Sequence, residues 1–162
     1  MGGYDRAAFF EEPTVSDRTF RCRVVTPAES LLDEPVEYAN VPLWDGLMGF
    51  QHGRAPIVAK LGIGELKLHF PASTHGGADR SFFIDSGFVQ MSDGELIILA
   101  EHAQAAETIA ESDAQKELDE AERLQPDPDA PDRGYEADRI RRARERARVR
   151  LRIARHSRAK GI

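Results

Sequence analysis

The sequence predicts a mainly β protein with an added α-helical part: an N-terminal antiparallel β-sandwich of about ten strands, followed by a C-terminal two-helix hairpin. Short runs of alternating apolar and polar residues, separated by turn signals, recur from residue 20 to residue 102. That pattern is typical of a sandwich or flattened barrel. From about residue 103 the chain becomes rich in Ala and Glu and loses Gly and Pro, which favours helix. A second such stretch follows a loop with three prolines, and prolines interrupt a helix.

We divide the chain at these changes of composition. Its first residues show little periodicity, so we expect a loosely ordered N-terminal extension there. The expected parts are the extension at 1–19, the sandwich at 20–102 and the hairpin at 103–162, with helices at about 103–124 and 135–157 and a Pro-rich linker at 125–134.

Each strand is predicted from its alternation and from the turn residues that bound it. Phe20 to Val25 alternates and ends at a Thr-Pro turn, and Asp93-Gly94 marks the last hairpin. In order, we expect strands at 20–25, 31–32, 36–43, 47–50, between Pro56 and Gly62, and at 63–70, 81–85, 88–92 and 95–100.

The stretch from Trp44 to Phe70 is the centre of the predicted sandwich. Asp45-Gly46 is a hairpin turn signal, and Gly53 can adopt a positive φ in the corner that follows. Pro56 favours an extended conformation at the residue before it. We therefore predict a rigid β corner that presents a loop.

The two predicted helices carry narrow apolar stripes and opposite charges. Residues 101–132 have a net charge of −9, and residues 133–162 have a net charge of +9. The stripes consist mostly of alanine, which buries little area at about 25 cal/mol per Å². Exposed ion pairs add only about 0–1 kcal/mol each. We therefore predict a hairpin that forms but can open, as a conformational switch would. The expected stripe residues are Ala103, Ala106, Ala110, Ala114, Leu118, Ala121 and Leu124 in the first helix, and Ile140, Ala143, Ala147, Leu151 and Ala154 in the second.

The composition argues against an enzyme. No catalytic residue, metal site or cofactor is expected, because the five histidines show no helical ligand spacing and no Gly-rich phosphate loop is present. Ser86 lies in a turn rather than in a nucleophile elbow. The single Cys22 fits a reducing compartment and a buried position. No apolar run is long enough to cross a bilayer.

Eleven arginines lie between Arg133 and Arg158. They indicate an anionic partner, or a solvated face that pairs with the acidic first helix. Nucleic acid is the less favoured partner, since Tyr135 is the only aromatic residue in this stretch.

Three segments of the chain carry a resemblance to a known family. GLMGFQHGRAPIV, which begins at Gly46, resembles the signature of the ε subunit of F-type ATP synthases (δ in mitochondria), with His52 in place of the usual Pro and Arg54 in place of the usual His. Val25 to Glu29 resembles the family's opening turn, and Phe83 to Glu101 resembles its last hairpin. The resemblance covers about residues 20 to 105.

The resemblance implies a ten-stranded β-sandwich and a non-catalytic rotor subunit of the central stalk, which links γ to the ring of c subunits. By position, it places Trp44, Asp45, Leu47, Met48 and Arg54 at the loop that faces the c-ring. It also implies a peripheral location, through the complex, on the cytoplasmic face of the bacterial inner membrane.

The family's C-terminal helices can inhibit ATP hydrolysis by extending along γ. The resemblance therefore suggests Arg144, Arg148 and Arg155 as regulatory residues that face acidic surfaces of the α/β catalytic head. Some members bind ATP in the folded hairpin through an I/L-D-x-x-R-A motif. Here Ala110 replaces its Asp and Asp113 replaces its Arg, which argues against tight nucleotide binding.

An alternative function remains at this point. The chain could be a β-module adaptor whose Arg-rich helix binds nucleic acid or an acidic protein.

Overall fold

The structure, a computed structural model, describes residues 18–160 and confirms the predicted fold class. The extension predicted at 1–19 lies almost wholly outside the described residues. The strands are β1 (Phe20–Val25), β2 (Ser30–Val36), β3 (Tyr38–Leu43), β4 (Gly46–Gln51), β5 (Ile57–Lys60), β6 (Ile63–His69), β7 (Asp79–Ser92) and β8 (Glu95–Ala105). The helices are α1 (Ala72–His75), the 3-10 turn η2 (Ala106–Thr108), α2 (Glu111–Arg123) and α3 (Arg133–Lys160).

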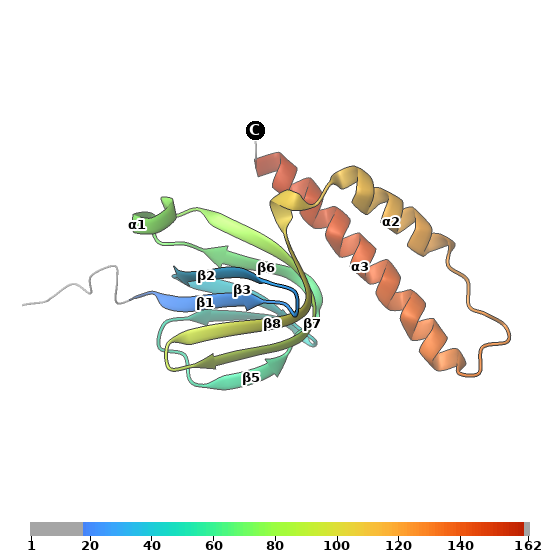
Figure 1. Cartoon of the computed structure of the whole chain (residues 1–162), viewed down its shortest axis with the longest axis horizontal. Coiled ribbons are helices and arrows are strands. Elements are labelled where there is room, and N and C mark those ends of the chain that lie inside the picture. Colours follow the sequence, from blue (N-terminus) through green and yellow to red (C-terminus); the bar gives the residue numbers. More distant parts are fainter. Residues whose placement is uncertain (1–17, 161–162) are drawn as a thin grey trace, which may run out of the picture.

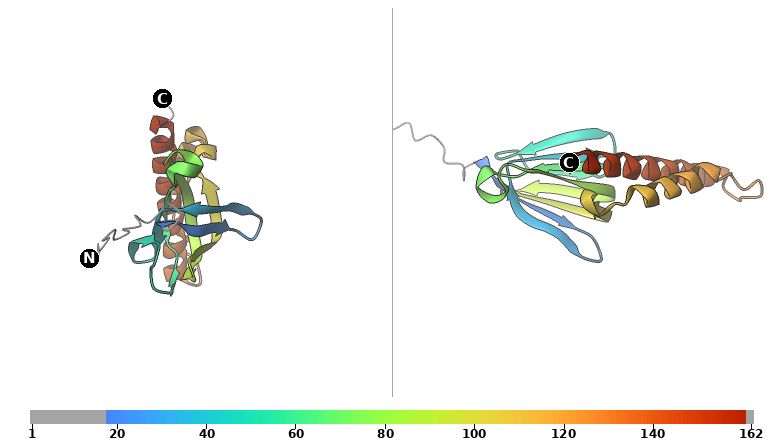
Figure 2. Two further views of the ribbon diagram at one scale, coloured as in Figure 1. Left: turned by 90° about the vertical axis from the view of Figure 1, so that its left-hand side faces the viewer. Right: turned by 90° about the horizontal axis from the view of Figure 1, so that it is seen from above.

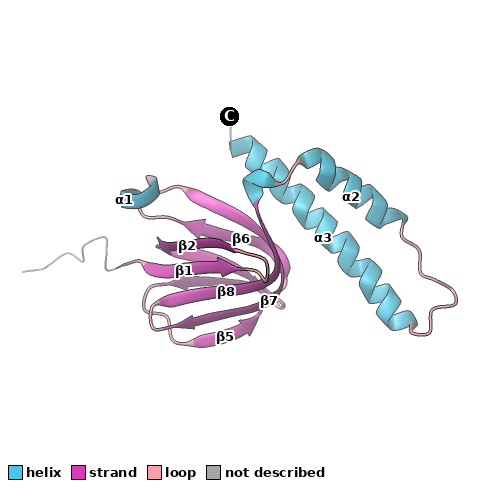
Figure 3. Cartoon of the chain, viewed as in Figure 1, coloured by secondary structure: helices cyan, strands magenta, loops and turns pink. Residues whose placement is uncertain are grey.

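The strands form two layers that share β7 and β8. The order along the sheet is β2-β1-β8-β7-β6-β3-β4, and β5 pairs with β7. The first half of β7 pairs with β6, whereas its second half pairs with β5. Because β7 and β8 each take part in both layers, the described residues need only eight strands where about ten were expected. Figures 1 and 3 show these layers at one end of the molecule, with the short α1 beside them, and α2 and α3 at the other end.

The change of layer occurs at Ser86-Gly87. Ser86 has a φ of 60° and Gly87 a φ of 114°. A Cβ at Gly87 would collide with the carbonyl oxygen of Leu99 on β8, so only glycine fits there. The pairing of β7 with β8 continues on both sides of this point without a change of register. The bend therefore redirects both long strands together.

We name the two layers after what covers their outer faces. The helix-side layer consists of β4, β3, β6, the first half of β7 and the end of β8. The bare layer consists of β5, the second half of β7, the start of β8, and β1 and β2. Within the bare layer β1 pairs with β8 in parallel, and β2 is the strand at that edge. The core lies between the layers and includes the fully buried Phe50, Phe70, Phe82, Leu66 and Ile98.

The first helix begins later than predicted, and the prediction of helix from residue 103 is wrong. β8 continues to Ala105, and Ala103 and Ala105 pair with Ile84 and Phe82 of β7. Alanine has a good helix propensity, but here the backbone ladder offered by the long neighbouring strand prevails. The short α1 lies between the strands expected at 63–70 and 81–85, where no helix was predicted.

The helical hairpin runs away from one end of the sandwich. Figure 1 shows α3 beside β7, with α2 on the side of α3 away from the strands, and Figure 2 shows the hairpin from above. The main contacts of α3 are with β6, β7, η2 and α2. Because α3 packs on two partners, it carries two buried stripes: the predicted one, which includes Ala147 and Leu151, and an unpredicted one with Val149 and Ile153.

Candidate functional site

The predicted β corner presents two large apolar side chains to solvent. Trp44, in the turn between β3 and β4, is 71% exposed, and Leu47 at the start of β4 is 67% exposed. Asp45 lies beside them in the turn and is also exposed. Exposed tryptophan and leucine side chains this close together are typical of a protein contact. Met48 does not belong to this surface, because it is half-buried and packs against the core.

Arg54 folds back along β4. Its Nη1 donates a 2.9 Å hydrogen bond to the carbonyl oxygen of Gly49, and its guanidinium lies 5.2 Å from the ring centre of Phe50. β4 is the last strand of the sheet order, so its outer edge has unpaired backbone groups. Arg54 covers one of these carbonyls and leaves the guanidinium exposed at the corner.

The outer face of the bare layer carries a second apolar surface. Phe88 on β7 and Leu99 on β8 stand directly opposite each other and are 56% and 51% exposed. Val25 on β1 pairs with Leu99 on its other side, and Val58 on β5 is also largely exposed. We call this set the bare-face patch. It spans four strands, and among the described residues nothing covers it.

The two helices of the hairpin are joined by narrow packing and by charge. Ala114 and Ala121 of α2 are buried, as the stripe pattern predicted, and Leu118 is half-buried. At the first turn of α2, Glu111 accepts hydrogen bonds from Arg155 at 3.2 Å and from Arg158 at 3.1 Å. These hydrogen bonds hold the pKa of the Glu111 carboxyl below its usual value.

Arg144 closes the other end of α2. Its Nε donates to the carbonyl of Ala121 at 3.2 Å, and its Nη2 donates to that of Leu124 at 2.9 Å. The last carbonyls of a helix have no partner within the helix, and a cation is favoured beside them. The predicted regulatory residues thus share one face of α3. Arg144 and Arg155 bond to α2, and Arg148 lies 3.8 Å from Glu122.

A different face of α3 is tied to the sandwich through a buried carboxylate. Asp85 on β7 is 1% exposed and is the buried charged residue of the described chain. Arg146 reaches its Oδ2 with Nη2 at 2.5 Å and Nε at 2.6 Å, while the Ser86 hydroxyl donates to Oδ1 at 2.9 Å. All these contacts lie on the outer face of the helix-side layer. The sequence analysis missed this pair, although an aspartate inside the apolar run Phe82-Phe83-Ile84 was a usable signal.

Arg150 makes the next contact along α3. Its Nη2 donates to Gln104 of β8 at 2.8 Å, its Nη1 lies 3.3 Å from Glu117, and its guanidinium lies 5.6 Å from the ring centre of Phe83. It therefore touches the sandwich and both helices at once.

The positions of the degenerate nucleotide motif are structural in this chain. Ala110 is the N-cap of α2, and its carbonyl accepts the backbone N–H of Asp113 at 3.2 Å. The Asp113 carboxylate is exposed in the first turn, where a negative charge suits the helix dipole. Neither residue offers a group that would hold a phosphate.

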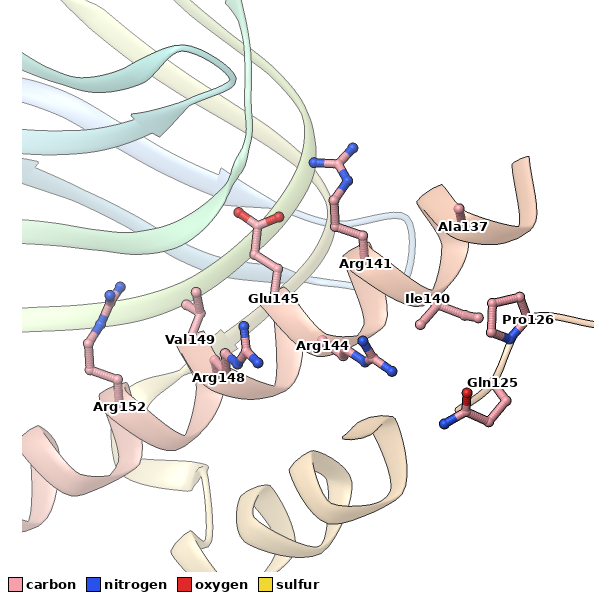
Figure 4. A pocket seen from close by; sticks show the side chains of 10 residues that line it. All are labelled: Gln125, Pro126, Ala137, Ile140, Arg141, Arg144, Glu145, Arg148, Val149 and Arg152. Carbon is pink, nitrogen blue, oxygen red and sulfur yellow. The ribbon is translucent and has the colours of Figure 1, made fainter. Parts of the chain in front are cut away.

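A groove of about 930 Å³ lies along α3 (Figure 4). Four arginines and one glutamate line it, together with the start of the linker. Figure 4 shows Arg144 and Arg148 on one side of α3, with Arg141 and Arg152 above them. The groove is an open, basic strip on the hairpin and contains no group suited to catalysis.

Within residues 18–160, no three His, Cys, Asp or Glu side chains are grouped as metal ligands would be. None of the described helices has the length and apolarity that a membrane crossing requires.

Comparison with known proteins places these features in one family. The β-sandwich domain described as "ATP synthase, Delta/Epsilon chain" matches residues 19–106. The chain is 37% identical to the ATP synthase epsilon chain of Rhodopirellula baltica over 103 residues, which covers 64% of this chain and 77% of the relative. It is 32% identical to the ATP synthase epsilon chain of Nitratidesulfovibrio vulgaris over 135 residues, which covers 83% of this chain and 97% of the relative.

A solved structure shows the same fold over both parts of the chain. A chain in the Euglena gracilis mitochondrial ATP synthase (OSCP/F1/c-ring) aligns with a TM-score of 0.65 and 24% identity, covering 80% of this chain and 78% of that one.

Proposed function

The chain belongs to the ATP synthase delta/epsilon family, and from that premise we propose that it is the ε subunit in the central stalk of an F-type ATP synthase. In this role it catalyses nothing itself. It joins γ to the c-ring so that rotation passes between them. The observation that carries the proposal is the family sandwich with two separate exposed apolar surfaces, the β corner and the bare-face patch.

We assign the two surfaces to the two partners. The β corner, with Trp44, Asp45, Leu47 and Arg54, faces the c-subunit loops, in agreement with the family resemblance at these positions. The bare-face patch faces γ, because it spans four strands of the layer that the helices leave uncovered. Met48 supports the corner from inside rather than touching the ring.

The complex places the chain at the cytoplasmic face of the bacterial inner membrane, as a peripheral subunit. Contact with the c-ring brings it to the membrane.

The hairpin acts as a brake on ATP hydrolysis when it leaves the folded position seen here. Arg144, Arg148 and Arg155 then lose their partners on α2 and become free to meet acidic surfaces of the α/β catalytic head. No bound nucleotide is part of this proposal. The adaptor alternative has no observation in its favour, since eight of the arginines on α3 have partners within the chain.

The experiment that tests the proposal mixes the full chain with purified γ, and separately with a γ–c-ring complex, and follows co-elution. Phe88→Ser with Leu99→Ser should abolish binding to γ, whereas Leu47→Ser should retain it and weaken only the complex that contains the c-ring. Each variant is the control for the other, because both remove exposed leucine without touching the core. If the unaltered chain binds neither γ nor the γ–c-ring complex, the proposal fails.

A further inference from the structure

The hairpin is held by two interfaces whose ion pairs differ in their exposure to solvent. Between α2 and α3, most ion pairs are exposed: Glu122 and Arg148 are both more than half exposed, and Arg158 is 80% exposed where it meets Glu111. The pair of Arg150 with Glu117 is more enclosed. Between α3 and the sandwich, the carboxylate of Asp85 is almost completely enclosed. Salt screens the first kind of pair strongly and the second kind weakly.

The apolar side chains at the two interfaces also differ in size. The buried residues of α2 are Ala114 and Ala121, beside the half-buried Leu118. On the other side, the larger Val149 and Ile153 of α3 share a buried cluster with Phe83 of β7. Beyond the connecting η2, α2 rests on α3 rather than on the strands. The element that follows the sandwich in sequence is thus the outer one in space, and the C-terminal helix is the inner one.

We propose that the hairpin comes apart in two separable steps: α2 leaves α3 in a salt-sensitive step, and α3 leaves the sandwich in a step controlled by the Asp85–Arg146 pair. Ser86 and the bend of β7 position the carboxylate for this contact. When Arg146 is absent, Asp85 beneath α3 is a buried charge without a partner, so docking of α3 becomes unfavourable. The pair therefore works as a latch for α3 alone.

The inference concerns the chain by itself and does not depend on its role in the complex. Two thiol reporters separate the steps. Ala121→Cys reports when α2 leaves α3, and Ile153→Cys reports when α3 leaves the sandwich, since both positions are buried in the closed hairpin. The natural Cys22 is buried in the sandwich core and reports unfolding of the sandwich.

Labelling rates are measured on the full chain at about 0.1 M and about 1 M salt, where the screening length falls from roughly 10 Å to roughly 3 Å. We expect salt to speed labelling at residue 121 severalfold and to leave residue 153 nearly unchanged. Arg146→Met and Asp85→Asn should each speed labelling at residue 153 by about tenfold or more at low salt. Asp138→Asn is the matched control, because it removes an exposed pair within α3.

Three results would overturn the proposal. One is an equal effect of salt at residues 121 and 153. Another is unchanged labelling at residue 153 in Arg146→Met. The third is labelling of Cys22 in Arg146→Met at the same rate as residue 153, because the pair would then hold the sandwich together rather than the helix. If Asp85→Asn also disturbs β7 itself, the labelling of Arg146→Met alone decides the test, because that substitution lies on α3.

Discussion

Arg144 donates a 2.9 Å hydrogen bond to the main-chain carbonyl of Leu124, so a side chain of the last helix completes the end of the preceding one. We expect Arg144→Met to destabilise the hairpin by about 1–2 kcal/mol, because it leaves helix-end carbonyls without a charged donor. Urea unfolding followed by far-UV circular dichroism measures the loss. Arg142→Met is the control, since Arg142 is exposed on the same helix, and an equal loss there would contradict the capping role.

The contact between Glu111 and its two arginines predicts a dependence on acid. The folded-state pKa of Glu111 is below its ordinary value of 4.5, so its contribution to stability is present above pH 4.5 and is lost as the pH falls through the lower folded value. Arg155→Gln should move the carboxyl pKa back toward 4.5. Titration of the Glu111 carboxyl by NMR measures both values. An unshifted pKa in the unaltered chain would rule out the pairing in solution.

Cys22 should be inert in the folded protein. Burial raises the pKa of its thiol from 9.0 to about 12, so at pH 8 almost no thiolate forms and no reagent reaches it. Because the folded pKa is the higher one, this group favours the folded state below pH 9, and the contribution is lost as the pH rises toward 12. Reaction with a thiol reagent, before and after addition of urea, checks the expectation. Fast labelling without urea would show that β1 is not a core strand.

Leu47→Asp tests the β corner. Leu47 is exposed, so we expect stability to change by no more than about 0.5 kcal/mol. Attachment to the c-ring should weaken, because a charge then stands where an apolar contact is made. ATP-driven proton pumping by the reconstituted complex measures the coupling, and Ser73→Asp serves as the control, because it adds the same charge at an exposed position of α1, outside both proposed surfaces. Equal pumping by Leu47→Asp and the unaltered chain would remove the corner from the interface.

Replacing Arg144, Arg148 and Arg155 by Gln should relieve inhibition of ATP hydrolysis in the complex, since the extended α3 would lose the charges proposed to meet the catalytic head. The same triple variant also loosens α2, so a control is needed. Arg133→Gln with Arg142→Gln is that control, because it removes charge from α3 without disturbing the hairpin. The proposed brake requires a larger rise in hydrolysis from the first set. An unchanged hydrolysis rate in the triple variant would exclude these residues.

Local patterns predicted the sandwich strands well because most strands have one buried and one exposed face; the first half of β7, which is buried on both faces, is an exception. The alternation in Phe20 to Val25 and the turn at Asp93-Gly94 both appear as expected. The start of α2 was missed for the opposite reason: Ala103 to Ala105 suit strand and helix alike, and only the neighbouring β7 decides between them. Sequence order alone does not reveal that neighbour.

The candidate site could likewise be predicted only where its residues belong to a local pattern. The exposed corner at Trp44 and Leu47 followed from the turn signals and the resemblance, and its partner remains a prediction. The Asp85–Arg146 pair joins residues far apart in the chain. Asp85 lies in the segment that resembles the family's last hairpin, but that pattern does not indicate a partner on α3. An aspartate in an apolar strand indicates that a partner exists, but the identity of that partner depends on how α3 lies across the sheet.

The parallel pairing of β1 with β8 also constrains how the protein is made. The first strand to leave the ribosome finds its second neighbour only when the last strand of the sandwich has been synthesised. Since β8 also completes both layers through β7, the domain cannot close during translation of its first seven strands. Helices α2 and α3 emerge after that point, so α3 meets a finished surface, and the hairpin is the last part of the chain to find its place.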